Sequence, residues 1–285
     1  MNIVSDLYND LALWRGWAVF EAVAARGNTL FHWDDHYARL VQSCIGARIP
    51  FDCGSSSALE YAVRDEIALR SYKESLVKIL VTRGRSHNHS TPVAGSSALL
   101  ISVLPFPVRS PRPLKLEVQR GIREFPHIKL AGGYGYTMLR AEIAAEHGCD
   151  DFLFSSPETG ITEASVGNVF FIWRNAHGVP ILSTPDHSIL RGVTRRIVLE
   201  VARRSTIFNE VCDLAFQGNL IDIFTRDPHA ECFITSTTRG IHPVQSIVDT
   251  NGAVFTFCTG PETITEKLKA MFLEYREAYF AKHGA

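Results

Sequence analysis

Four prolines fall within nine residues of this chain, in the run Pro105-Phe106-Pro107-Val108-Arg109-Ser110-Pro111-Arg112-Pro113. Proline fixes φ at about −65° and lacks a backbone N–H, so it is excluded from the interior of a helix and of a central strand. The chain therefore has to leave regular structure at this point. We interpret residues 107–113 as a linker between a small N-terminal α/β domain, residues 1–106, and a larger C-terminal domain, residues 114–285.

Strand and helix patterns alternate on both sides of this linker. Apolar, β-branched runs at 17–25, 76–83 and 99–104 predict strands, whereas apolar residues at helical spacing predict a helix over 33–47. A second helix is predicted over 57–70. After the linker the pattern predicts strands over 150–154, 168–173, 179–182, 231–235 and 242–247, and helices over 136–147, 190–203 and 261–280. This alternation predicts a mixed α/β fold class.

The composition excludes several classes of protein. Hydrophobic residues make up 46% and charged residues 21%, and the formal net charge is −1, so no basic field favours nucleic acid. The six cysteines contain no Cys-x-x-Cys pair, so neither zinc spacing nor a disulfide framework is expected. The N-terminus lacks the features of a signal peptide, and no apolar run reaches the roughly 18 residues of a membrane span. We therefore expect a cytoplasmic protein without a metal, a membrane or a nucleic-acid partner.

Lys129 and Glu163 are the candidate chemical groups. Lys129 lies in Pro126-His127-Ile128-Lys129-Leu130-Ala131-Gly132-Gly133-Tyr134, before a glycine-rich turn, and Glu163 follows in Gly160-Ile161-Thr162-Glu163. A pyridoxal-phosphate site needs one amine, which forms a Schiff base with the aldehyde, and one acid, which holds the pyridine nitrogen protonated. Residues 190–195 predict a loop that opens a helix, whose free N–H groups suit a phosphate. Taken singly, these residues also fit a surface charge, a turn flank and a helix cap.

Four motifs occur in an order and spacing that strengthen this interpretation. Residues 163–170 read Glu-x-Ser-x-x-Asn-hydrophobic-Phe, and residues 184–195 read Thr-Pro followed by Leu-x-Gly-hydrophobic-Thr-Arg. The other two are the N-terminal pair at 19–23 and 35–40 and the run at 233–244. Together they resemble the fold-type IV pyridoxal-phosphate enzymes, the class IV aminotransferase family. That family includes branched-chain aminotransferases, D-amino-acid aminotransferases and aminodeoxychorismate lyase, and the resemblance covers most of the chain.

The resemblance implies the two-domain fold-type IV architecture, pyridoxal 5′-phosphate as cofactor, and a set of site residues. Lys129 would carry the cofactor and Glu163 would bind its ring nitrogen. The cofactor phosphate would be held by an arginine, two backbone N–H groups and two hydroxyls, from Arg39, Val193, Thr194 and Thr237. Tyr134 lies where branched-chain enzymes carry a tyrosine that touches the cofactor ring oxygen.

Substrate recognition departs from the known subtypes of this family. D-amino-acid enzymes place an arginine and a histidine after the Thr-Arg-Gly found here at 82–84, whereas this chain has His87 and His89 in a shorter segment. These histidines either bind a carboxylate or are loop residues. Phe20 stands where the D-amino-acid enzymes have a tyrosine, which counts against that subtype. Thr238 and Arg239 are further candidates for the substrate carboxylate.

The resulting hypothesis is an aminotransferase that moves an amino group from a small amino acid or amine to an α-keto acid in a ping-pong cycle. By the same resemblance we expect a homodimer, with the site at a domain boundary near the partner subunit. One alternative is an aminodeoxychorismate-type lyase that releases pyruvate. Another is a catalytically inactive family member that only binds the cofactor, although retention of both Lys129 and Glu163 counts against it.

Overall fold

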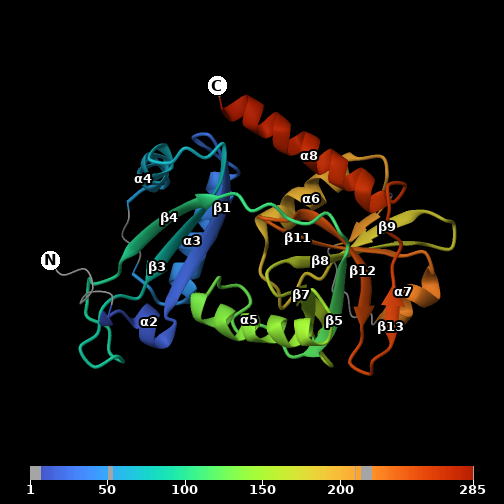
Figure 1. Ribbon diagram of the computed structural model, residues 1–285, viewed down its shortest axis with the longest axis horizontal. Helices are drawn as coiled ribbons and strands as arrows, with labels where there is room; N and C mark the ends of the chain where they lie inside the picture. Colours follow the sequence, from blue (N-terminus) through green and yellow to red (C-terminus); the bar gives the residue numbers. More distant parts are fainter. Residues whose placement is uncertain (1–7, 51–53, 209, 213–219, 285) are drawn as a thin grey trace. The chain divides into compact units, whose positions relative to one another are not determined.

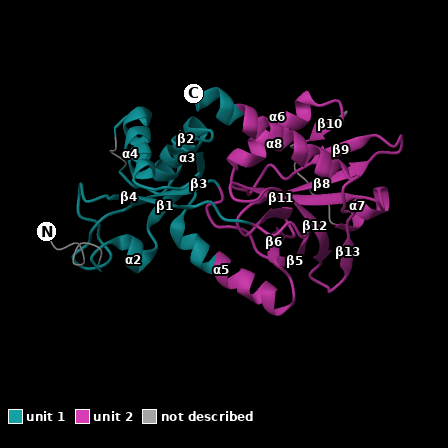
Figure 2. Cartoon of the chain, turned by 45° about the horizontal axis from the view of Figure 1, so that its top comes forward, with its two compact units in different colours: residues 1–108, 127–136, 279–285 teal, residues 109–126, 137–278 magenta. Residues whose placement is uncertain are grey.

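The computed structural model describes residues 8–50, 54–208, 210–212 and 220–284 (Figure 1). Helices and strands are both present throughout, so the predicted mixed α/β class is confirmed. The chain forms two compact units (Figure 2). Unit 1 combines the residues up to 108 with residues 127–136 and the last residues from 279, whereas unit 2 comprises residues 109–126 and 137–278.

The described residues of unit 1 form a four-stranded antiparallel sheet covered on one face by two helices. Its strands are β1 (Ala18–Arg26), β2 (Thr29–Leu30), β3 (Glu74–Thr82) and β4 (Leu99–Pro105), and its helices are α2 (Leu11–Arg15), α3 (Trp33–Gly46) and α4 (Ser56–Ala68). The sheet order is β2-β1-β3-β4. Alternate strand residues such as Val19, Val23 and Val77 pack against Leu40 of α3 and Val63 of α4, because successive side chains of a strand point to opposite faces.

Residues 127–136 belong to unit 1, although they follow the proline-rich linker in the sequence. The reason is backbone pairing with β1. Phe20 N donates to Lys129 O at 3.0 Å, and Leu130 forms an antiparallel bridge with Val19. The predicted division placed this segment, with Lys129, in a domain of residues 114–285. This long-range pairing returns residues 127–136 to a sheet formed earlier in the chain. A division of the chain into two consecutive stretches cannot represent such a return.

The helix after Lys129 begins earlier than the sequence predicted. Helix α5 spans Ala131–Glu146 rather than 136–147, so Gly132 and Gly133 lie inside its first turn and do not form a glycine-rich turn. Gly132 is needed for close packing: an added Cβ would lie 2.8 Å from the carbonyl oxygen of Gly16. The Gly132 N–H donates to the same oxygen at 3.0 Å. The glycine therefore lets the helix start approach the end of α2.

Unit 2 contains a mixed nine-stranded sheet within its described residues. Its strands are β5 (Leu114–Arg120), β6 (Asp151–Ser156), β7 (Gly160–Ala164), β8 (Asn168–Arg174), β9 (Pro180–Ser183), β10 (Glu210–Cys212), β11 (Glu231–Ser236), β12 (Gly240–Val248) and β13 (Val254–Thr256). The order is β10-β9-β8-β11-β12-β5-β6-β7, with β13 beside β12. Strand β7 also pairs with β8, so the strands from β8 to β7 close into a ring. Closure satisfies backbone groups that would otherwise lie at open sheet edges.

The described residues also form helices α6 (Val193–Arg204), α7 (Leu220–Arg226) and α8 (Ile264–His283). Strands β2, β5, β7, β10 and β13 and helices α2 and α7 were not among the predicted elements. In β7 the sequence Gly-Ile-Thr-Glu-Ala has only weak strand character, and its pairing with β6 and β8 makes it a strand.

Membrane spans and metal sites can be assessed for the described residues only. No helix there combines the length and the apolar character required to cross a bilayer. The same residues contain no group of three or more His, Cys, Asp or Glu side chains that could hold a metal ion. Cys53 lies outside the described residues; the cysteines within them are free thiols, at Cys44, Cys149, Cys212, Cys232 and Cys258.

The close approach of α2 to α5 can be tested with Gly16→Ala. Gly16 has a φ of +61°, and an added Cβ would lie 2.6 Å from Gly132 Cα. Gly27, with a φ of +51° and nothing within 4 Å of an added Cβ, is the matched control. Both alanines carry the left-handed penalty of about 1–2 kcal/mol, but only Gly16→Ala adds a packing clash of about 1–3 kcal/mol. Thermal denaturation should therefore show a Tm several degrees lower for Gly16→Ala than for Gly27→Ala; equal Tm values would contradict this account.

Candidate active site

Lys129 is anchored through its backbone to two elements of unit 1. Its carbonyl accepts from Phe20 N of β1, and its N–H donates to Ser43 Oγ of α3 at 3.1 Å. Ser43 is fully buried. These hydrogen bonds of β1 and α3 fix the position of the Lys129 backbone independently of its side-chain contacts.

The Lys129 amine is half-buried against aromatic rings. Nζ donates to the hydroxyl of Tyr134 at 3.1 Å and lies 4.5 Å from the centre of the Phe20 ring. The two rings meet edge to face, with centroids 4.9 Å apart. No carboxylate among the described residues forms an ion pair with this amine. An amine in such surroundings is unusual for a structural lysine, since lysine is seldom buried without an acidic partner.

Arg39 lies on α3 and forms an ion pair with Glu21 of β1. Its Nε and Nη2 atoms donate to the two carboxylate oxygens of Glu21, each at 2.8 Å. His36 Nδ1 lies 2.7 Å from Glu21 Oε2. The predicted phosphate-binding arginine thus already has two of its N–H donors engaged, which fixes the plane of its guanidinium group.

Glu163 is buried in unit 2 and held by two donors. Arg123 Nε donates to Oε1 at 2.7 Å, and the backbone N–H of Leu190 donates to Oε2 at 3.1 Å. Arg123 is itself buried, and its Nη2 donates to the carbonyl of Ser165 at 2.8 Å. Two donors on different oxygens fix the orientation of this carboxylate.

The Glu163 motif also organises the start of helix α6. Asn168 Nδ2 donates to the carbonyl of Leu190 at 2.8 Å, and an added Cβ on Gly192 would lie 2.3 Å from Asn168 Oδ1. Gly192 is the N-cap of α6 and has no side chain to cap the helix. The N-cap residue therefore supplies no side-chain acceptor for the first N–H groups of α6, at Val193 and Thr194. Such N–H groups at a helix N-terminus can bind an anion.

The turn after β11 approaches the same motif. An added Cβ on Gly167 would lie 2.4 Å from the carbonyl oxygen of Thr235, and Thr235 pairs with Asn168 in the sheet. The Thr235 hydroxyl is buried and has no hydrogen-bond partner within the described chain. Thr237 and Thr238 follow in the turn and are half-buried. The structure therefore brings the segments 163–168, 190–194 and 235–238 of unit 2 together.

Arg239 and His89 make contacts that sequence reasoning did not foresee. Arg239 Nη1 donates to the buried Asp151 at 2.9 Å. The ring of His89 stacks on Trp14 with centroids 4.6 Å apart, and its carbonyl accepts from Arg15 Nε at 2.8 Å. His87 is exposed in the same loop. His89 is thus packed against helix α2, which fits the interpretation of these histidines as loop residues.

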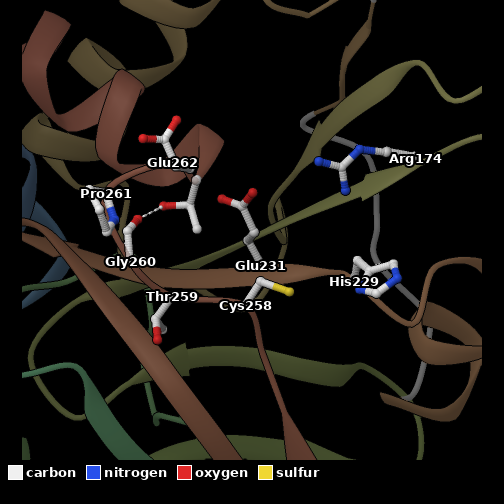
Figure 3. Close-up of a pocket in the computed structure, with 9 residues that line it drawn as sticks. Arg174, His229, Glu231, Cys258, Thr259, Gly260, Pro261 and Glu262 are labelled. Atoms are coloured by element: carbon white, nitrogen blue, oxygen red, sulfur yellow. Dashed lines mark hydrogen bonds between the residues drawn. The ribbon is translucent and has the colours of Figure 1, made fainter.

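A separate cavity of about 320 Å³ lies at the opposite end of β11 from Thr235 (Figure 3). Arg174 and His229 stand at one end of it and Glu262 at the other. The Glu231 carboxylate in its wall accepts from the N–H groups of Ile264 and Thr265 at the start of α8. The described residues that line this cavity include none of the predicted site residues. Its buried acid, Glu231, already caps the start of α8.

Sequence reasoning missed the charged partners of the predicted residues. Arg123 and Glu21 were not predicted, and neither was Arg109, whose Nη2 lies 3.5 Å from Thr238 Oγ1. Burial lowers the pKa of Arg109, and the neighbouring charge of Arg239 lowers it further. The one signal in the sequence was Glu21 itself, an acidic residue inside the apolar run at 18–25, where an unpaired charge is costly.

The Arg123–Glu163 pair gives a stability prediction. Arg123→Met should leave the Glu163 carboxylate buried without its counter-ion and cost about 3–5 kcal/mol in the free energy of unfolding, measured by urea denaturation. The double variant Arg123→Met/Glu163→Gln should recover much of that loss because no charge remains unpaired. Arg112→Met, which removes an exposed ion pair with Asp150, is the control and should cost less than about 1 kcal/mol. A loss as small in Arg123→Met as in Arg112→Met would contradict a buried ion pair.

Comparison with known proteins agrees with the geometry of both units. Residues 18–247 match the model of the family described as amino-transferase class IV. A Rickettsia typhi protein assigned as a branched-chain-amino-acid aminotransferase is 26% identical over 238 residues, which cover 81% of this chain and 78% of that protein. Two solved structures share the fold at 22% identity.

The first is the branched-chain aminotransferase of Thermoproteus uzoniensis, with a TM-score of 0.79 and coverage of 95% of this chain and 91% of that chain. The second is a Legionella pneumophila protein assigned as a 4-amino-4-deoxychorismate lyase, with a TM-score of 0.77 and coverage of 94% of both chains. The resemblance stated from the four motifs is thereby confirmed. Because the family model spans more than half of its residues, this chain belongs to the class IV aminotransferases, a family of pyridoxal-phosphate-dependent enzymes.

Proposed function

We propose that this protein transfers an amino group from a small amino acid or amine to an α-keto acid, with pyridoxal 5′-phosphate as cofactor and in a ping-pong cycle. The observation that carries the proposal is the half-buried amine of Lys129. It lies against Phe20 and Tyr134 with no ion-pair partner among the described residues. This arrangement suits an amine that has to bond a carbonyl carbon, because no described carboxylate engages it in an ion pair.

The residues of each unit fit the proposed cofactor. When bound, pyridoxal phosphate supplies an aldehyde that accepts the donor's amino group and stores it between the two half-reactions. Lys129 Nζ would hold the cofactor and then move a proton to and from the substrate α-carbon. The Glu163 carboxylate would accept a hydrogen bond from the ring nitrogen and keep it protonated. Arg123 and Leu190 N hold that carboxylate in place by their hydrogen bonds to it.

Groups from several segments would bind the phosphate. Arg39 offers a guanidinium whose plane is set by Glu21. Val193 and Thr194 offer the first N–H groups of α6, and Thr237 offers a hydroxyl. Each of these groups donates hydrogen bonds, as a phosphate dianion requires, and the helix start adds a favourable dipole.

The substrate carboxylate would meet the turn after β11. Thr238 is half-buried there, and Arg109 lies 3.5 Å from its hydroxyl. Arg239 is held by Asp151, so it would act as a fixed donor rather than a mobile one. Phe20 and Tyr134 would line the substrate side of Lys129, and His87 and His89 remain further candidates for substrate contact.

We also propose that the enzyme is a cytoplasmic homodimer. Family resemblance motivates this, and the surface of unit 1 is consistent with it. Leu99, Leu100 and Leu104 of β4, an edge strand of the described sheet, each expose more than a third of their surface. Exposed apolar side chains that gather on one strand are typical of a surface that another protein copy covers.

The role of Lys129 can be tested by chemical labelling. Borohydride treatment of the protein with bound pyridoxal phosphate should attach a pyridoxyl group to Lys129, and peptide mapping should find it there. The exposed Lys78 and Lys115 serve as internal controls within the same digest. Lys129→Arg should abolish the label, because a guanidinium does not form this bond. A label on Lys78 or Lys115 would show that another amine holds the cofactor.

Transamination can be separated from lyase chemistry in a single half-reaction. The loaded enzyme mixed with a good donor and no acceptor should release about one equivalent of keto product per site and then stop, because the amino group stays on the cofactor. Added keto acid should restart turnover. Glu163→Gln should slow this step by orders of magnitude, whereas Glu158→Gln, in the exposed turn nearby, should not. Continuous pyruvate release from aminodeoxychorismate without an acceptor would instead identify a lyase.

A further inference from the structure

Glu21 is an acid in the middle of an apolar layer. It lies on β1 between Val19 and Val23, which share its face of the sheet, and all three are fully buried beneath the helices of unit 1. Burial of an ionised carboxylate is costly unless it is paired and hydrogen-bonded. The partners that compensate the buried charge of Glu21 therefore indicate its role.

Both oxygens of Glu21 are bound by residues of helix α3. Arg39 donates through Nε to Oε1 and through Nη2 to Oε2, at 2.8 Å in each case, and His36 Nδ1 lies 2.7 Å from Oε2. Burial raises the pKa of the Glu21 carboxyl, but the charge of Arg39 and the hydrogen bonds from Arg39 and His36 lower it more, so it lies well below its usual value. Glu21 is thus a carboxylate and Arg39 a guanidinium ion at neutral pH.

His36 completes this cluster as a neutral side chain. Burial lowers the pKa of His36 more than the attraction of Glu21 raises it, and the charges of Arg39 and Lys129 lower it further. A neutral imidazole beside a carboxylate donates through the nitrogen that faces it, so Nδ1 carries the proton. The cluster therefore holds one negative and one positive charge, and these three hydrogen bonds converge on Glu21.

The same two elements that Glu21 joins also hold Lys129. The residue next to Glu21, Phe20, donates to the Lys129 carbonyl, and Ser43 of α3, one turn beyond Arg39, accepts from the Lys129 N–H. The Glu21 cluster therefore joins the same two elements, β1 and α3, that bind the backbone of Lys129. A group fixed at this point is well placed to act on the cofactor bound to that lysine.

We propose that Glu21 is a positioning residue, which holds the Arg39 guanidinium in the orientation that binds the cofactor phosphate. This inference rests on the proposed function. A free arginine side chain loses much rotamer freedom when it binds an anion, whereas a guanidinium already fixed by two bonds loses little. Glu21 uses two of the five N–H donors and defines the plane in which the others lie. It would thereby strengthen phosphate binding without touching the cofactor.

The test compares the binding of pyridoxal phosphate and of pyridoxal, which lacks the phosphate, to the apo-protein. Glu21→Gln keeps the size of the side chain but loses one acceptor and the charge. The affinity for pyridoxal phosphate should fall roughly ten- to hundredfold, the range expected for a charge-assisted hydrogen bond, while the affinity for pyridoxal should stay unchanged. Glu74→Gln is the matched control, since it breaks another acid–arginine pair of the same sheet, with Arg26. It should change neither affinity.

Two further variants separate positioning from a purely structural role. In an Arg39→Ala background, Glu21→Gln should have no additional effect on pyridoxal phosphate, because no guanidinium remains to be positioned. Glu21→Asp keeps the charge but withdraws the carboxylate by one methylene. If Glu21→Gln does not fold, Glu21→Asp should show the same selective loss. Equal loss of both ligands, or no loss of either, would overturn the proposal, whereas failure of the unsubstituted protein to bind pyridoxal phosphate would overturn the proposed function itself.

Discussion

The backbone pairing between Phe20 and Lys129 is the contact that places the candidate lysine in unit 1. It joins β1 to a segment more than a hundred positions later, and it sets where the half-buried amine lies. The close approach of Gly16 and Gly132 continues this pairing into the first turn of α5. A lysine in an exposed loop would be mobile in both backbone and side chain. The backbone of Lys129 is instead bound on two sides, by Phe20 and by Ser43. Its amine can therefore be held against Phe20 and Tyr134 with little further ordering.

Each unit contains a buried carboxylate that is held by an arginine distant in the sequence. Glu21 is paired with Arg39, and Glu163 with Arg123. In neither case does the acid stand alone in the core, because an unpaired charge there would be neutralised or expelled. The two pairs differ in their proposed use. In the first pair the arginine would bind the cofactor phosphate and the acid would orient it. In the second pair the acid would bind the cofactor ring nitrogen and the arginine would orient it.

The ring of strands in unit 2 explains why three separated motifs meet. Strand β7 carries Glu163 and pairs with β8 at Asn168, and β8 pairs with β11 at Thr235. Because Asn168 also binds the carbonyl of Leu190, the start of α6 is drawn to the same place. The glycines at 167 and 192 are required where these segments approach most closely. The motif spacing in the sequence thus reflects one packed cluster.

The sequence by itself determined the mixed α/β fold class, because local periodicity and turn residues report directly on helices, strands and their ends. The family followed from the resemblance of four ordered motifs to those of known enzymes. The sequence also identified Lys129 and Glu163 as candidate chemical groups. Only the tertiary structure decided which unit holds Lys129 and that Gly132 and Gly133 belong to a helix. Only it showed that Glu21 and Arg123 pair with the predicted residues. These features depend on contacts between residues far apart in the chain, and hydrogen bonds across such distances leave no periodic trace in the sequence.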